Sequence, residues 1–109
     1  KTLEVAENGR VSSVFVTKKM MEETEASVAL TEDFINFPRS LKGVDVALLF
    51  REVSPVKYRV SLRSRGGVDV ARIAADFQGG GHPNAAGCTV EGTLPEVKAK
   101  VLERVQAAL

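Results

Sequence analysis

Two neighbouring segments in the middle of the chain carry the pattern that most constrains its fold. The segment VDVALLF (residues 44–50) places its valines, a leucine and the phenylalanine on one face, and VKYRVSLRS (residues 56–64) alternates strictly between apolar and polar residues. A period of two is typical of a β-strand with one buried face. A Ser-Pro dipeptide between the segments marks a turn. The pattern therefore predicts a β-hairpin, with Ser61 and Arg63 on the polar face of its second strand.

The first third of the chain gives weaker signals. The segment VSSVFVT (residues 11–17) is rich in β-branched and aromatic residues, which predicts a strand. Thr17 is positioned to cap a short helix over residues 18–23. A second short helix is expected over residues 31–37, ending at Pro38.

The last third has clearer boundaries. Asp69 is a suitable cap for a helix over residues 70–77, which the glycines beginning at Gly79 would end. A short strand is expected over residues 87–91, and the capping-box sequence TLPE then begins a helix that runs to about Ala108. The two helices are expected to bury Val70, Ile73, Ala74, Phe77, Val97, Val101, Leu102 and Val105. The order β, short helices, β-β, α, β, α predicts a single α/β domain, in which a small mixed sheet with a central hairpin packs against helices.

Bulk composition restricts the class of protein. The chain has 109 residues, of which 44% are hydrophobic, and this suits one globular domain. No apolar stretch approaches the roughly 20 residues that span a bilayer, so a soluble cytoplasmic protein without membrane contact is expected. Cys88 is the only cysteine and His82 the only histidine, so neither an internal disulfide nor a closed zinc site is expected. The first residues, KTLEV, lack a methionine, which suggests a fragment of a longer protein.

Charge is distributed unevenly along the chain. Residues 1–38 carry four Lys or Arg against seven Asp or Glu (−3), residues 39–72 carry eight against three (+5), and residues 73–109 carry three against four (−1), which sums to +1. So small a net charge argues against a generic duplex binder. The basic middle segment can attract an anion, although a solvated sheet face would show the same composition.

The sequence GGGHPNAAG (residues 79–87) is the most unusual segment. Glycines let a ligand approach the main chain closely, and successive N–H groups in a glycine loop can form an anion-binding nest. His82 adds a hydrogen-bond donor, and Arg63 offers a planar group that suits phosphate. A helix-ending turn with an incidental histidine also fits these residues, so both interpretations stay open at this point.

Four segments together resemble the DHH-associated domain, which forms the C-terminal half of RecJ-like and nanoRNase-like phosphoesterases. These segments are INFPRSLKGVDVALLFRE (35–52), SLRS (61–64), DVARIAADF (69–77) and the GGGHPNAAG loop. The similarity extends from about Val11 through the final helix. Gln78 departs from the family pattern, because many relatives have a further glycine there, and this puts the flexibility of the loop and its contact with a base in doubt.

The resemblance implies that residues 1–109 form one substrate-binding domain, and that the catalytic DHH domain is missing from this chain. In the family, that N-terminal domain binds two divalent metal ions, typically manganese. No catalytic or metal-binding residue is therefore expected here, and the chain alone should hydrolyse nothing. Matched to the family motifs, the residues expected to bind substrate are Arg63, Ser64, Gly79, Gly80, Gly81, His82, Asn84 and Arg51.

The resemblance also implies partners. The expected ligands are short single-stranded RNA or DNA or nucleotides: short oligoribonucleotides, 3′-phosphoadenosine 5′-phosphate, and linear or cyclic dinucleotides. The expected protein partner is the N-terminal DHH domain of the same chain, in a parent that can be a homodimer. Two other readings share the motifs: a fragment of a RecJ-type single-strand exonuclease, and a tRNA-binding module related to the C-terminal domain of alanyl-tRNA synthetases. A purely structural or dimerisation domain is the remaining alternative.

Overall fold

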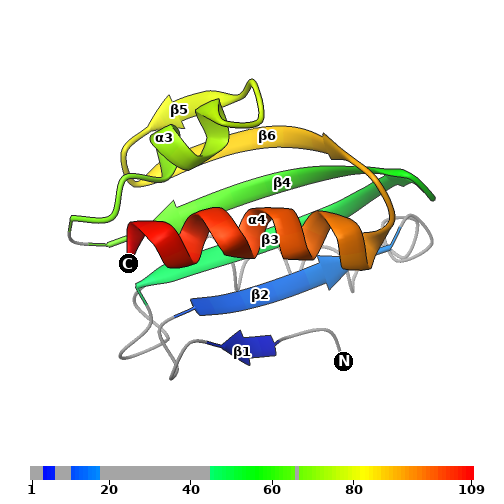
Figure 1. Cartoon of the computed structure of the whole chain (residues 1–109), viewed down its shortest axis with the longest axis horizontal. Coiled ribbons are helices and arrows are strands. Elements are labelled where there is room, and N and C mark those ends of the chain that lie inside the picture. The colour runs from blue at the N-terminus through cyan, green and yellow to red at the C-terminus, as the bar shows by residue number, and fades with distance from the viewer. Residues whose placement is uncertain (1–3, 7–10, 18–44, 66) are drawn as a thin grey trace, which may run out of the picture.

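The computed structural model shows a single small α/β domain built on one six-stranded sheet (Figure 1). It describes residues 4–6, 11–17, 45–65 and 67–109. The strand order is β1-β2-β3-β4-β6-β5. Strands β2 and β3 are parallel, and the other neighbouring pairs are antiparallel. The sheet is therefore mixed, as the sequence predicts.

Most of the predicted elements are present. In chain order the described elements are β1 (Glu4–Ala6), β2 (Val11–Val16), β3 (Val46–Ser54), β4 (Lys57–Ser64), α3 (Val70–Ala75), β5 (Gly80–His82), β6 (Ala85–Glu91) and α4 (Leu94–Ala108). The first predicted strand, the central hairpin β3-β4 and the last helix are confirmed. The short helices expected over 18–23 and 31–37 lie outside the described residues.

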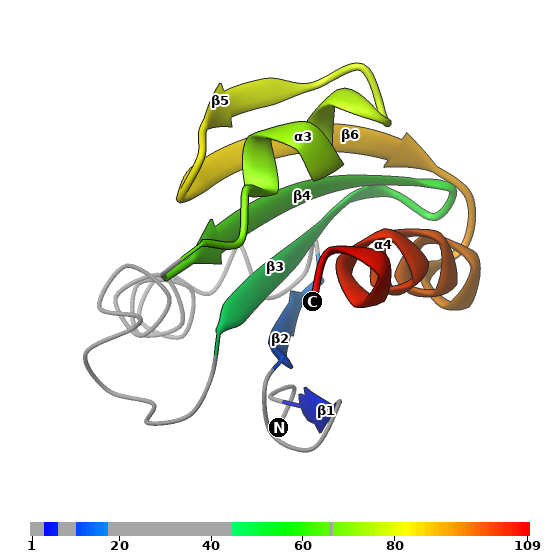
Figure 2. The same cartoon turned by 60° about the vertical axis from the view of Figure 1, so that its left-hand side comes forward.

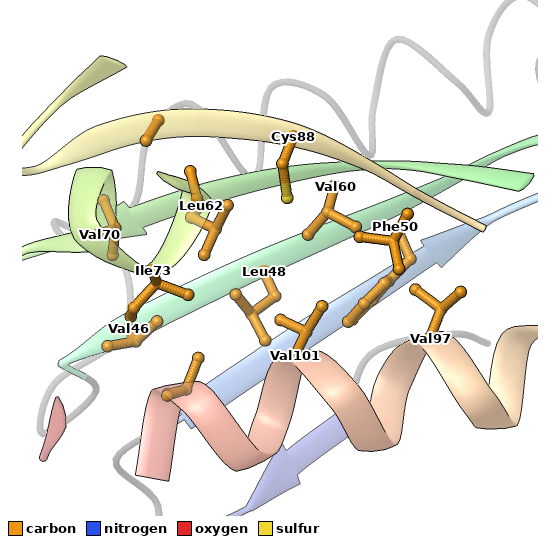
Figure 3. Close-up of a cluster of buried hydrophobic side chains, with 14 of the residues drawn as sticks. Val46, Leu48, Phe50, Val60, Leu62, Val70, Ile73, Cys88, Val97 and Val101 are labelled. Carbon is orange, nitrogen blue, oxygen red and sulfur yellow. The ribbon is translucent and has the colours of Figure 1, made fainter. Parts of the chain in front are cut away.

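Both described helices cover the same face of the sheet, and the core lies between them and the strands (Figures 1 and 2). Val97 and Val101 of α4 point toward Leu48 and Phe50 of β3 (Figure 3). Of the helix residues expected to be buried, Val70, Ile73, Ala74, Val97, Val101 and Val105 are buried, while Phe77 and Leu102 are half-buried against the core. Neither helix is long and apolar enough to cross a membrane, and this holds for every helix in the described ranges.

The N-termini of both helices are capped as predicted. The Asp69 carboxylate accepts hydrogen bonds from the backbone amides of Ala71 (3.0 Å) and Arg72 (3.2 Å). The Glu96 carboxylate accepts from the backbone amide of Thr93 (2.8 Å) and from its hydroxyl group (3.1 Å). These hydrogen bonds hold the pKa of Glu96 below its ordinary value. The caps fix where each helix begins on the sheet.

The prediction of a loop over the glycine run was wrong in one respect. Gly80–His82 form the edge strand β5, which pairs antiparallel with Ala85–Gly87 of β6. Strand β6 therefore begins at Ala85, two residues before the predicted Gly87. The segment is a tight hairpin that turns at Pro83 and Asn84. The glycines have little β-propensity of their own, so this strand exists because β6 lies beside it.

Helix α3 ends earlier than predicted, at Ala75, in a Schellman motif. The amide of Gln78 donates to the Ala75 carbonyl (3.0 Å), and the amide of Gly79 donates to the Ala74 carbonyl (2.8 Å). Gln78 has φ of 65°, in the left-handed region where this motif usually places glycine. A residue with a side chain is strained in that conformation.

We therefore expect Gln78→Gly to stabilise the domain by about 0.5–1 kcal/mol, because the left-handed backbone carries no steric penalty for glycine. Chemical denaturation measures the change. Ala75→Gly is the matched control, since Ala75 is an exposed helical residue and glycine there should lower stability by about 1 kcal/mol. A loss of stability in both variants would show that Gln78 is not strained.

The Cys88 thiol is buried in the hydrophobic core, and burial raises its pKa to about 11, against the ordinary value of 9.0. A raised pKa in the folded state means that stability is fully present below pH 9 and is lost as the pH rises toward 11. We expect the free energy of unfolding of wild type to fall toward that of Cys88→Ala over this range. A difference between the two proteins that stays constant from pH 8 to pH 11 would contradict the burial of this thiol.

Candidate functional site

The side of the sheet that faces away from the helices is open over only part of its width. There, Ser12, Val14 and Val16 of β2 and Ala47 of β3 are buried. The outward side chains of β4, β5 and β6 are exposed or half-buried. We call this region the open face; its residues are Arg51, Arg59, Ser61, Arg63, Gly80, His82, Ala85, Gly87 and Thr89.

Strand register brings His82 and Arg63 into one row across the open face. His82 is opposite Ala85, and Ala85 is opposite Arg63. Neighbouring strands lie about 4.8 Å apart, so the backbones of His82 and Arg63 are about 10 Å apart. Only the methyl group of Ala85 projects between them. An imidazole and a guanidinium group can thus approach the same anion from two sides.

The second row of the open face has almost no side-chain bulk. Gly80 is opposite Gly87, and Gly87 is opposite Ser61. A Cβ atom added to Gly80 would meet no heavy atom within 4 Å. Such a surface lets a flat group approach the main chain, with the Ser61 hydroxyl as a donor or acceptor beside it.

Arg59 lies next to this second row, on the side away from Arg63. It lies opposite Thr89, and its Nη1 atom donates to the Thr89 hydroxyl over 3.4 Å. A Cβ atom added to Gly87 would lie 2.8 Å from Nη2 of Arg59, so the guanidinium group rests over Gly87. Arg51 follows in the same row, opposite Arg59 on β3. Arg59 was absent from the predicted site, although the alternation of β4 places it on the same face as Arg63.

The three predicted glycines have different environments. A Cβ atom at Gly79 would lie 2.2 Å from the Gly87 carbonyl oxygen, and one at Gly81 would lie 2.6 Å from the Ala85 carbonyl oxygen. Gly81 also has φ of 147°. These two positions require glycine because β5 approaches β6 so closely. Only Gly80 presents open space on the side where a ligand can reach it.

Ser64 and Asn84, both predicted to bind substrate, meet at the turn of the β5-β6 hairpin. The Ser64 hydroxyl lies 2.7 Å from the Val68 carbonyl oxygen and 3.2 Å from that of Pro83, and it accepts from Nδ2 of Asn84 (3.0 Å). The backbone amide of Ser64 donates to the Asn84 carbonyl (3.0 Å). We call this cluster the Ser64–Asn84 clamp. It fixes the turn next to His82 against the end of β4 next to Arg63. Direct contact of either residue with a substrate stays a prediction.

A hollow of about 520 Å³ lies beside the part of β6 that β5 leaves unpaired. Its lining combines both signs of charge: Lys57, Asp76, Phe77, Gln78, Thr89, Val90, Glu91 and Lys100. Asp76 already pairs with Arg104 (3.5 Å), and the Lys100 ammonium donates to the Glu91 carbonyl (3.3 Å). The open face, with its arginines and histidine, suits a phosphate group better.

The donor residues needed for a metal site do not come together in the described part of the chain. No three His, Cys, Asp or Glu side chains there are close enough to hold an ion. His82 is the only histidine of the sequence.

Comparisons with known proteins give a consistent result. The DHHA1 domain model matches residues 9–109. The chain is 36% identical over 97 residues to the bifunctional oligoribonuclease and PAP phosphatase NrnA of Thermus thermophilus, covering 88% of this chain and 29% of that protein. It is 32% identical over 85 residues to the probable NrnA of Streptococcus mutans, covering 78% and 27%. The chain thus spans less than a third of these relatives.

Two solved structures resemble the fold. An exopolyphosphatase-related protein from Bacteroides fragilis superposes with a TM-score of 0.78 at 29% identity, over 96% of this chain and 31% of its own. The pGpG-specific phosphodiesterase PggH from Vibrio cholerae superposes with a TM-score of 0.63 at 13% identity, over 99% of this chain and 36% of its own. At this low identity, the second likeness supports the fold alone.

Gly79, which directly precedes β5, and Gly80 of β5 give a paired test of the site geometry. We expect Gly79→Ala to destabilise the domain by more than about 2 kcal/mol, because its methyl group would overlap backbone atoms of β6. Gly80→Ala adds the same group in open space and should change stability by less than about 0.5 kcal/mol. Thermal denaturation of the two variants measures both effects. Equal losses in both would mean that β5 does not pack as described.

Proposed function

The chain belongs to the DHHA1 domain family, the C-terminal domain of DHH-family proteins, and from this premise we propose that it recognises the substrate of a phosphoesterase. The proposed ligand is a short nucleotide: a short oligoribonucleotide, 3′-phosphoadenosine 5′-phosphate, or a dinucleotide. Support comes from the names of the two similar proteins, which describe an oligoribonuclease and PAP phosphatase. Both activities act on phosphate groups attached to nucleosides.

The single observation that carries this proposal is the row of His82, Ala85 and Arg63 on the open face. Arg63 is half-buried, and its Nη1 atom donates to the Leu62 carbonyl (3.0 Å), which holds the guanidinium group close to the strand. A held guanidinium group loses less conformational entropy when it binds phosphate. His82 is exposed at the sheet edge and supplies a second donor.

The remaining predicted residues support this pair in different ways. Gly80 leaves room for a sugar or base next to the phosphate, while Gly79 and Gly81 let β5 lie against β6. Ser64 and Asn84 hold the hairpin turn in place. We propose that these four residues shape the site, and that Arg63, Gly80 and His82 contact the ligand.

The open face suits a short ligand better than a long single strand. Long single strands are usually bound by aromatic side chains on which successive bases stack. None of the open-face residues is a Phe, Tyr or Trp, and the imidazole of His82 is the only aromatic ring among them. In the described part of the chain, Phe15 and Tyr58 are on the core side, with ring centroids 6.3 Å apart. This favours a nanoRNase-like parent over a RecJ-type exonuclease, and the similar phosphoesterases disfavour a tRNA-binding module.

Hydrolysis itself is proposed to take place elsewhere. The described residues supply no metal-binding cluster, so we assign the metal ions, expected to be manganese, to a DHH domain of the parent protein. The role of this chain is to hold and orient the nucleotide. The pure chain should accordingly show no manganese-dependent phosphatase or nuclease turnover.

Calorimetry or NMR titration with the 5′-phosphorylated dinucleotide pApA tests the site. We expect Arg63→Ala and His82→Ala each to weaken binding by about 10-fold, the loss of roughly one charge-assisted hydrogen bond. Wild-type affinity should fall as salt rises, since the contact is with phosphate.

Arg72→Ala is the matched control, because Arg72 is an exposed arginine on α3, on the opposite side of the sheet. It should bind pApA like wild type. Absence of binding by wild type at millimolar pApA, or equal binding by all four proteins, would contradict the proposed site.

A further inference from the structure

Two arginines are directly opposite each other on the open face. Arg51 of β3 pairs in register with Arg59 of β4, and both side chains are exposed. Like charges opposite each other in neighbouring strands destabilise a sheet. Among the described residues, the ion pairs lie away from these two arginines: Arg104 pairs with the carboxylates of Asp76 and Glu103. An anion bound beside both side chains would offset the like-charge repulsion between them.

The Arg59 guanidinium group is already oriented along the open face. It rests over Gly87, where an added Cβ atom would lie 2.8 Å from its Nη2 atom. Its hydrogen bond to the Thr89 hydroxyl is long, at 3.4 Å, so little interaction energy would be lost on binding a better acceptor. The Arg59 guanidinium group therefore occupies the space above Gly87, one row from His82 and Arg63.

The spacing matches one ligand with two phosphate groups. Successive same-face residues of a strand are about 6.8 Å apart, so the row of Gly87 lies about 6.8 Å from the row of Arg63. Because the Arg59 guanidinium group reaches over Gly87, it can meet a group bound one row away from Arg63. The open space above Gly80, which lies opposite Gly87 in the same row, has room for the connecting sugar.

We propose that Arg51 and Arg59 form a second anion subsite, which takes the second phosphate of a linear dinucleotide whose first phosphate is bound at Arg63 and His82. This rests on the proposed function, and it adds a preference: the domain selects ligands with two phosphates over nucleoside monophosphates. Arg59 is the specificity-determining residue, and Arg51 completes the subsite from β3.

The test compares AMP, which has one phosphate, with pApA, which has two. Wild type should bind pApA about 10-fold or more tightly than AMP. In Arg59→Gln and Arg51→Gln, the pApA affinity should fall to near that of AMP, while the AMP affinity changes less than about two-fold. The slope of the logarithm of pApA affinity against the logarithm of salt concentration should also decrease in each variant by the amount that corresponds to about one phosphate contact.

A second readout separates binding from folding. Without ligand, Arg59→Gln should melt at the same temperature as wild type or higher, because the like-charge pair is removed. Arg72→Gln serves as the matched control and should keep the wild-type preference for pApA.

The outcomes distinguish the two proposals. If pApA binding falls in Arg63→Ala and His82→Ala but is unchanged in both glutamine variants, the second subsite is overturned and the proposed function stands. If the glutamine variants weaken AMP and pApA equally, the subsite is also overturned, because the arginines then act on the first phosphate. If wild type binds neither ligand, both proposals are overturned.

Discussion

The close approach of β5 to β6 is the contact on which the candidate site depends. At Gly79 and Gly81 a methyl group would overlap the β6 backbone, so only glycine permits this distance. The resulting hairpin extends the sheet by one strand and carries His82 to the same face as Arg63. With a larger residue at either position, β5 would separate from β6 and His82 would lose its fixed distance to the arginine.

The interior of the domain and its open face are built from the same strands. On one side of β4, Tyr58, Val60 and Leu62 pack against the helices. On the other side, the intervening Arg59, Ser61 and Arg63 form a basic surface with small neighbours on β6. A rigid sheet thus holds polar groups whose spacing is set by strand geometry and varies little, which suits recognition of a small ligand. The Ser64–Asn84 clamp adds a local constraint where the two binding rows end.

The sequence predicted the elements whose signals are local. The alternation over residues 56–64, the cap at Asp69 and the capping box at Thr93 each depend on neighbouring residues, and each was confirmed. Strand β5 was predicted as a loop, because glycine has little intrinsic preference for a strand and the pairing partner is decisive. The sequence also could not predict that Arg51 lies opposite Arg59, since this register depends on an irregularity between Glu52 and Ser54. One residue of slip would have reversed the faces of a strand. Gly79 and Gly81 lie against the β6 backbone, while Gly80 has open space around it. This difference likewise depends on the distance between the glycine segment and β6, which the sequence does not show.

The central claim is that a nucleotide binds on the open face and not in the hollow beside β6. An NMR titration of the ¹⁵N-labelled chain with pApA tests this most directly, because each backbone amide reports on its own surroundings. We expect concentration-dependent shifts at Ser61, Arg63, Gly80, His82 and Gly87, with little change along α4. Shifts concentrated at Phe77, Gln78 and Lys100, around the hollow, would contradict it.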